Sequence, residues 1–497
     1  MQKSKVIEYL KTHELDIQSA VASYLALSVA FKSYSEAYNH LGFNYGPCFS
    51  YFEKNQNRKP YFHHIVSKKQ VEQAADKVFL DYLRNPKSLD KFIENHQKAG
   101  EKAFVVWKNY KNNPKKDKKL LEQKFSEFLK AEGIFWHYTL AGEDKGEVIN
   151  RKIVPIFAKL RKISQEKSRK IIQIISHPEE PAIFSLERKD FLRLCLGFVE
   201  NQKTIAEDIN KYLKKYFWFK TDFYGNKKFD DEVVVSEIKK EISENKLKEI
   251  KEEIKKIEEN FLKIKEFKKD LLKKLKLNNE EKELINFATK FSLWIDQRKQ
   301  WMMEQFFYLF DLTEEAARIL KTSYEEISFC SREEIMSCLR RGKGLEKSTI
   351  KFRRGEFLVA FRRGEKETFF FGKDARDILK VALGESNKEI KGMVASNGSQ
   401  DIVFGKARII IHVEKEDFNQ GEILITSMTR VEFVPLMKKA SAIITDEGGM
   451  ACHAAIVSRE LGIPAIIGTK NATNAIQNGD QIEMNLKTGK IKIISKK

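Results

Sequence analysis

The chain has 497 residues, of which 42% are hydrophobic, and its formal net charge at pH 7 is +20. This length exceeds the size at which a single hydrophobic core stops growing, so more than one domain is expected. No run of about 18 apolar residues occurs, which excludes an ordinary membrane-spanning helix. The N-terminus lacks the apolar core of a secretory signal, and the five scattered cysteines form no CxxC pair. These features predict a cytoplasmic protein with reduced thiols and no membrane partner.

The positive charge comes largely from lysines that are interleaved with glutamates and are not gathered into basic arms. Such a balance can indicate nucleic acid, anionic ligands or an acidic partner protein. The interleaving favours solvated helix faces, so we do not expect nucleic acid as a partner. A salt-dependent gel shift would reveal nucleic-acid binding if it occurred.

Residues 1–229 are expected to form a large, mostly α-helical region, because apolar residues recur at helical spacing over residues 4–31 and 68–107. Its frequent aromatic residues are expected to pack between helices or, alternatively, to line a substrate pocket. Residues 230–309 are interpreted as a long charged helical hairpin. The first helix of this hairpin could belong to a projecting arm or to a helical bundle. It carries a narrow apolar seam that consists of Ile250, Ile254, Ile257, Phe261 and Ile264.

Residues 310–390 are expected to form a small α+β connector. A helix should begin at DLTEEAARIL, residues 311–320, with Thr313 and Glu315 in its first turn. The stretch STIKFRRGEFLVAFRRGEKETFFFG, residues 348–372, predicts an antiparallel meander, because two RRG turns separate β-rich runs. After a polar linker, residues 391–497 alternate short strands with short helices, which is typical of a compact α/β domain.

The most informative stretch is TDEGGMACHAAIVSRELGIPA, residues 445–465. SAIIT, residues 441–445, predicts a buried strand, and Gly448 and Gly449 permit tight backbone with positive φ angles. A helix is expected to begin near Cys452 and to stop at Gly462. His453 would then lie in the first helical turn, where free backbone N–H groups and the helix dipole favour an anion.

Several uses of His453 are open from the residues alone. A neutral imidazole is a competent nucleophile near physiological pH, so His453 could carry a phosphoryl group. A metal site would need partners, and His412 is the only other histidine of the segment, without ligand spacing. A serine hydrolase would need a nucleophile elbow, and no GxSxG occurs. The remaining alternative is a structural histidine without a catalytic role.

Residues 391–497 resemble the swivelling phosphohistidine (mobile) domain of phosphoenolpyruvate-utilising enzymes, such as phosphoenolpyruvate synthase and pyruvate phosphate dikinase. The resemblance rests on GKA, GEILIT, TxxxFVPLM from Thr429, AIITDEGG and CHAAIVSRELGIPAIIGT. It implies that His453 becomes phosphorylated and that Gly448 and Gly449 shape its loop. Thr429 and Arg459 match recurring positions, and the resemblance implies supporting roles for both. Many members have Thr where this chain has Ala451.

The resemblance also implies ATP or phosphoenolpyruvate as the phosphoryl donor, with Mg²⁺ at a donor site whose ligands are not identifiable in this sequence. No VRSSAxxED stretch of an ATP-grasp domain and no GxxxxGK[ST] loop occur. The order of the segments is similar to rifampicin phosphotransferases, in which a helical domain binds the acceptor.

The sequence therefore predicts a phosphotransferase, or a subunit of one, that relays a phosphoryl group through His453. A separate ATP-grasp-type subunit and a small-molecule acceptor are the expected partners. The alternative is a non-catalytic regulatory or binding protein that uses the same fold without turnover.

Overall fold

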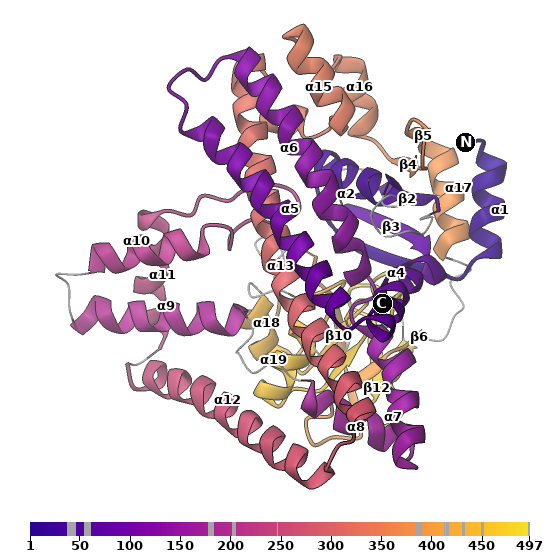
Figure 1. Cartoon of the computed structure of the whole chain (residues 1–497), viewed down its shortest axis with the longest axis vertical. Helices are drawn as coiled ribbons and strands as arrows, with labels where there is room; N and C mark the ends of the chain where they lie inside the picture. Colours follow the sequence, from indigo (N-terminus) through magenta and orange to yellow (C-terminus); the bar gives the residue numbers. More distant parts are fainter. Residues whose placement is uncertain are drawn as a thin grey trace.

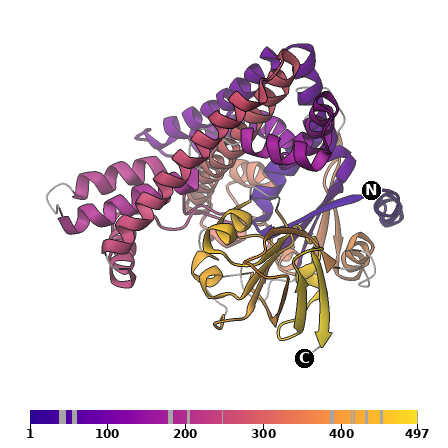
Figure 2. The same cartoon turned by 90° about the horizontal axis from the view of Figure 1, so that it is seen from below.

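The computed structural model describes residues 1–36, 46–53, 61–176, 183–200, 205–245, 247–383, 390–411, 413, 417–429, 433–448 and 452–495. Helices predominate, and two β-sheets accompany them (Figure 1). The C-terminal domain, residues 390–495, packs against one side of the helical part (Figure 2). None of the described helices combines the length and the apolar composition that crossing a bilayer requires.

The first sheet joins segments that are far apart in the sequence. Its strand order is β1-β3-β2-β4-β5, and all neighbouring strands are antiparallel. Three strands come from the N-terminal part and two from beyond residue 356: β1 (Leu15–Val21), β2 (Cys48–Phe52), β3 (Tyr61–Ser67), β4 (Phe357–Phe361) and β5 (Thr368–Phe371). Helices α1 (Lys3–Thr12) and α17 (Gly372–Leu383) cover one face, and α2 (Tyr24–Glu36) packs on the other. Strand β1 is an edge strand.

Three local expectations require correction. The helical spacing over residues 4–31 is interrupted by β1, which pairs with β3 from Leu15 to Val21. The hairpin β4–β5 confirms the antiparallel part of the expected meander, but residues 347–353 form helix α16 (Lys347–Arg353). No helix begins at residue 311, because Thr313 lies inside a longer helix and donates from Oγ1 to the Leu309 carbonyl over 2.7 Å.

A helical body forms around α13 (Asn279–Leu320), whose first turn is closed by a capping box between Asn278 and Glu281. Together with α2 and the sheet, the helices around it build the main hydrophobic core: α4 (Lys68–Arg84), α5 (Lys87–Lys111), α6 (Lys118–Thr139), α7 (Val154–Arg161), α8 (Gln165–Ile175), α14 (Tyr324–Ile327) and α15 (Arg332–Arg341). Many aromatic side chains, such as Phe135, Trp136 and Trp294, are buried in this core. That placement favours packing as the reason for the high aromatic content.

A second set of helices projects to the left of the helical body in Figure 1. This arm consists of α9 (Ile183–Glu200), α10 (Ile205–Tyr216), α11 (Asp231–Glu244) and α12 (Leu247–Leu275). Of the apolar seam on α12, Ile250, Ile254 and Ile257 join a separate hydrophobic cluster with α9, α10 and α11. Figure 1 shows that α12 and α13 diverge from the turn between them.

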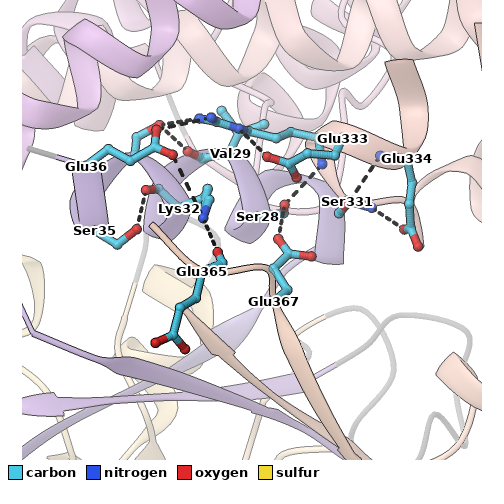
Figure 3. A network of polar contacts seen from close by, with 12 residues as sticks. Ser28, Val29, Lys32, Ser35, Glu36, Ser331, Glu333, Glu334, Glu365 and Glu367 are labelled. Atoms are coloured by element: carbon cyan, nitrogen blue, oxygen red, sulfur yellow. Dashed lines mark hydrogen bonds and ion pairs between the residues drawn. The ribbon is translucent and has the colours of Figure 1, made fainter. Parts of the chain in front are cut away.

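A partly buried polar network connects α2 to the β4–β5 hairpin and to the start of α15 (Figure 3). Ser28 Oγ donates to Glu367 Oε1 over 2.9 Å, and Lys32 Nζ donates to the Glu365 carbonyl over 2.7 Å. Glu334 lies at the N-terminus of α15 and receives two hydrogen bonds from the Arg353 guanidinium, at 2.6 and 2.8 Å. The charge of Arg353 is therefore neutralised within the fold.

The C-terminal domain contains an eight-stranded sheet of order β6-β13-β12-β8-β9-β10-β11-β7. Its parallel centre consists of β8 (Ile402–Ile409), β9 (Ile423–Thr426), β10 (Ala442–Thr445) and β11 (Ala465–Ile467). The flanking antiparallel strands are β6 (Ile390–Lys391), β7 (Met393–Ser396), β12 (Gln481–Asn485) and β13 (Lys490–Ser495). Helices α18 (Val434–Lys439), α19 (His453–Leu461) and α20 (Ala472–Ala475) alternate with the strands, as the sequence predicts.

Candidate functional site

His453 is the first residue of α19 and follows the loop that leaves the carboxyl end of strand β10. Cys452 is the N-cap, and its Sγ accepts a hydrogen bond from the Ala455 N–H over 3.4 Å. The helix ends at Gly462, whose φ of 67° is the left-handed conformation expected of a C-terminal stop. The sequence therefore predicts both ends of this helix correctly. The imidazole lies at the positive end of the helix dipole.

Thr429 fixes the orientation of the His453 ring. Its Oγ1 lies 2.8 Å from Nδ1 of His453, although the two residues are 24 positions apart. When the hydroxyl oxygen accepts the Nδ1–H, the lone pair of the neutral imidazole is on Nε2. No described residue forms a hydrogen bond with Nε2, so this nitrogen is available to a reactant.

The pKa of His453 is lowered to about 4, chiefly by burial and also by the nearby positive charge of Lys299 on α13. Desolvation and a like charge both disfavour the imidazolium. The ring is consequently neutral, and therefore nucleophilic, at physiological pH. Burial also raises the pKa of the Cys452 thiol, so the N-cap carries no charge beside the imidazole.

The loop before His453 is held by Asp446 and shaped by Gly448. Asp446 is buried, and its carboxylate accepts hydrogen bonds from the Thr469 hydroxyl at 2.8 Å and the Ala472 N–H at 2.6 Å. Gly448 has a φ of 117°, and a Cβ at this position would lie 2.6 Å from Sγ of Cys452. Only glycine therefore allows the loop to pass so close to the start of α19.

The same loop contacts the rest of the protein through Glu447. Its Oε1 accepts the Ser19 N–H of strand β1 over 2.8 Å, and its Oε2 accepts a hydrogen bond from Lys145 over 3.2 Å. Met428, beside Thr429, packs against the main hydrophobic core. The face of the C-terminal domain that carries His453 is thus docked onto the sheet and the helical body.

Arg459 lies apart from this cluster. Six residues along an α-helix turn its side chain about 120° away from that of His453. Arg459 lines an open groove of the C-terminal domain together with residues 394–399, Gly462 and Leu486. Burial lowers the pKa of its guanidinium. Gly449, also named from the sequence, lies outside the described residues, as do Ala451 and His412.

The structure brings Thr429, Gly448 and His453 together, as the sequence analysis expects. Sequence reasoning missed Lys299, Lys145 and Ser19, which approach the site from α13, from the turn after α6 and from β1. Nothing in the local sequence around these residues identifies them, because their roles arise from contacts with residues more than 150 positions away. Among the described residues, no group of three or more His, Cys, Asp or Glu side chains could hold a metal ion.

Comparisons with known proteins show that the C-terminal domain is similar to domains of phosphoenolpyruvate-utilising enzymes. The family model "PEP-utilising enzyme, mobile domain" matches residues 418–489. A probable phosphoenolpyruvate synthase of Staphylothermus marinus is 48% identical over 123 residues, which is 24% of this chain and 14% of that protein. The phosphoenolpyruvate synthase of Aquifex aeolicus is 43% identical over 114 residues, 22% of this chain and 13% of that protein.

One relative matches a longer part of the chain. The rifampicin phosphotransferase of Bacillus subtilis is 28% identical over 225 residues, which is 43% of this chain and 25% of that protein. The match is longer than the C-terminal domain itself, so it also includes residues before position 390. In each of these relatives, the aligned segment covers a quarter of the protein or less.

Proposed function

Since residues 418–489 match the mobile-domain model of phosphoenolpyruvate-utilising enzymes, we propose that the protein is a phosphotransferase, or a subunit of one. It relays a phosphoryl group through His453. The contact between Thr429 and Nδ1 of His453 supports this function most directly, because it presents a neutral Nε2 as the nucleophile. The site also lies at a helix N-terminus, which favours the negative charge of a phosphoryl group.

The relay consists of two displacements at phosphorus. In the first, the lone pair on Nε2 of His453 attacks the donor phosphorus, the N–P bond forms, and the bond to the donor oxygen breaks. Thr429 Oγ1 keeps its hydrogen bond to Nδ1–H as positive charge develops on the ring. In the second, an acceptor oxygen attacks phosphorus, the N–P bond breaks, and the acceptor proton leaves to a base or to water. Lys299 offsets part of the added negative charge when the domain is docked.

The donor is proposed to be ATP or phosphoenolpyruvate bound on another domain or another chain, such as an ATP-grasp-type subunit. Mg²⁺ at that donor site would neutralise charge on the transferring phosphoryl group.

The acceptor is proposed to bind on the helical side of the interface, because Lys299 of α13 lies near His453. The match to a rifampicin phosphotransferase, which is longer than the C-terminal domain, supports a small-molecule acceptor. An acceptor hydroxyl is the simplest reactant for the second displacement.

Intact-mass analysis tests the proposed function. The purified protein is incubated with Mg²⁺ and either ATP or phosphoenolpyruvate, with and without cell extract, beside a His453→Ala variant. We expect an acid-labile addition of one phosphoryl group that is absent from the variant. A requirement for extract would identify a separate donor subunit. The absence of labelling under every condition would contradict the proposal and favour a regulatory protein.

A further inference from the structure

Glu447 connects the loop before His453 to the open edge of the N-terminal sheet. Strand β1 pairs on one side only, with β3, so backbone N–H groups on its other side have no strand partner. One of these groups, the Ser19 N–H, donates to Oε1 of Glu447 over 2.8 Å. The other carboxylate oxygen, Oε2, accepts a hydrogen bond from Lys145 Nζ over 3.2 Å. The Glu447 side chain is only 9% exposed. Both oxygens of one buried carboxylate are therefore satisfied across the interface.

The β1 edge that contacts Glu447 is also held by hydrogen bonds within its own sheet. Ser19 Oγ lies 2.8 Å from Nδ1 of His63, and Nε2 of His63 lies 3.0 Å from Glu53. These contacts join β1 to β3 and to the residue that follows β2, within the sheet itself. Tyr61 extends the interface, because its buried hydroxyl lies near Ser427 of the C-terminal domain and Ser19 of β1. Little conformational freedom is then lost from the sheet when Glu447 binds.

Lys145, the cation of this contact, stays in its charged form and remains accessible to water. Burial disfavours the charge on Lys145, but the carboxylates of Glu447, Asp16 and Glu143 outweigh burial and raise its pKa. The Lys145 side chain is nevertheless 37% exposed, so water can replace the carboxylate when the two groups separate. The pair can consequently open and close without stranding a buried charge.

We propose that Glu447 is a latch that holds the C-terminal domain on the β1 edge and controls the access of reactants to His453. Glu447 lies six residues before His453, and the buried imidazole lies near Lys299 of the helical body. When the latch opens, the Glu447 carboxylate, the Lys145 ammonium and the Ser19 N–H all become exposed to water. Only the released domain can then carry His453 to a donor elsewhere. The latch extends the proposed function, but its test does not require phosphoryl transfer.

Three variants of the full chain test this latch: Glu447→Ala, Lys145→Met and the control Glu483→Gln. Glu447→Ala removes both contacts, and Lys145→Met removes only the ion pair. Glu483 lies on β12, which pairs only with strands of the C-terminal domain, so its substitution changes the charge without touching the latch. Circular dichroism and thermal unfolding establish that each variant is folded.

Two measurements report the docked state. Hydrogen exchange of the Ser19 amide reports the contact with Glu447, and the rate of His453 modification by diethyl pyrocarbonate reports its exposure. In Glu447→Ala we expect each rate to rise about tenfold or more, because a charge-assisted hydrogen bond contributes at least that factor. Lys145→Met should show a smaller increase, and Glu483→Gln none. Small-angle scattering should show a larger radius of gyration for folded Glu447→Ala.

Unchanged exchange, modification and scattering in folded Glu447→Ala would overturn the latch. Equal increases in Glu483→Gln would also overturn it, because a general charge effect would then explain the result. The outcome is separable from that of the proposed function. A protein whose His453 is never phosphorylated can still show the latch, and a phosphorylated protein can lack it.

Discussion

The Thr429 hydroxyl lies 2.8 Å from Nδ1 of His453, at the point where α19 begins. The contact joins the segment after β9 to the loop after β10, which are neighbouring parallel strands of the sheet. Parallel strands place their carboxyl ends at one edge, so the two residues meet even though they are distant in sequence. Because Thr429 engages Nδ1, the contact leaves Nε2 of His453 as the nitrogen that reacts.

Replacing Thr429 with Val should change which nitrogen reacts. Potassium phosphoramidate phosphorylates histidines without an enzyme, so it tests the ring directly. In the native protein we expect phosphorylation at Nε2 only. In Thr429→Val, labelling at Nε2 should fall about fivefold, the equivalent of one neutral hydrogen bond, and Nδ1 product should appear. Phosphorus NMR distinguishes the two isomers. Thr429→Ser keeps the hydroxyl and should behave like the native protein, and an identical isomer ratio in all three proteins would contradict this role of Thr429.

The reactivity of His453 should be nearly independent of pH between about 5 and 8. With a pKa of about 4, its imidazole remains neutral across this range, whereas an ordinary histidine becomes protonated below about 6.5. The rate of diethyl pyrocarbonate modification at His453, divided by that of a free histidine derivative, should therefore rise as the pH falls. Lys299→Met should raise the pKa of His453, but not to its ordinary value, because burial is the larger cause. A His453 that titrates near pH 6.5 in the native protein would contradict its burial.

The same pKa shift makes stability depend on pH with a definite sign. The folded pKa lies below the unfolded value of about 6.5, so the unfolded chain binds the proton more readily. The contribution of His453 to stability is full above about pH 6.5 and is lost as the pH falls toward 4, by at most roughly 3 kcal/mol. Thermal unfolding of the native protein and of His453→Gln should converge at neutral pH and diverge at pH 5. Parallel pH profiles for both proteins would disagree with this expectation.

Gly448→Ala should disrupt the loop before His453. The new Cβ would lie 2.6 Å from Sγ of Cys452, and the φ of 117° is strained for any residue with a side chain. Such strain costs of order 1–3 kcal/mol, so we expect a lower melting temperature and weaker phosphoramidate labelling. Adding Cys452→Ala should relieve the close contact and restore part of the loss. Gly364→Ala is a matched control, because Gly364 also has a positive φ but has no neighbour within 4 Å of the added Cβ.

Asp446→Ala should destabilise the C-terminal domain. The buried carboxylate accepts hydrogen bonds from the Ala472 N–H, the Thr473 N–H and the Thr469 hydroxyl. Removing it leaves these donors without their acceptor, at about 1–3 kcal/mol for each donor that stays buried and unpaired. Denaturant unfolding should show the loss, and Asp446→Asn should lose less because its amide oxygen still accepts. A fully native midpoint for Asp446→Ala would show that the network contributes nothing.

Much of the C-terminal domain could be predicted from its sequence, because the signals are local. SAIIT is a buried strand, and Gly462 stops α19 in a left-handed conformation, as expected. Strands β1 to β3 could not be predicted in the same way. They complete their sheet with β4, about 300 residues later, and that long-range pairing overrides the helical spacing around Ile17. Thr313 resembles a helix cap, but tertiary packing carries α13 through it.

In the candidate site, too, the residues of the local motif could be predicted from the sequence, whereas the residues contributed by distant segments could not. His453, Gly448 and Thr429 belong to one continuous motif, so they could be identified together. Lys299 and Lys145 reach the site only through the docking of the C-terminal domain onto the helical body. Their charges become relevant through the folded arrangement, which no local pattern encodes.

The most direct test of the central claim locates the phosphoryl group on the chain. Trypsin is expected to release residues 440–459 as one peptide, in which His453 is the only histidine. After incubation with cell extract, Mg²⁺ and either ATP or phosphoenolpyruvate, fragmentation of this peptide at neutral pH should place one acid-labile phosphoryl group on His453. An acid-stable group on a serine or threonine, or a peptide that stays unmodified with both donors, would contradict the relay through His453.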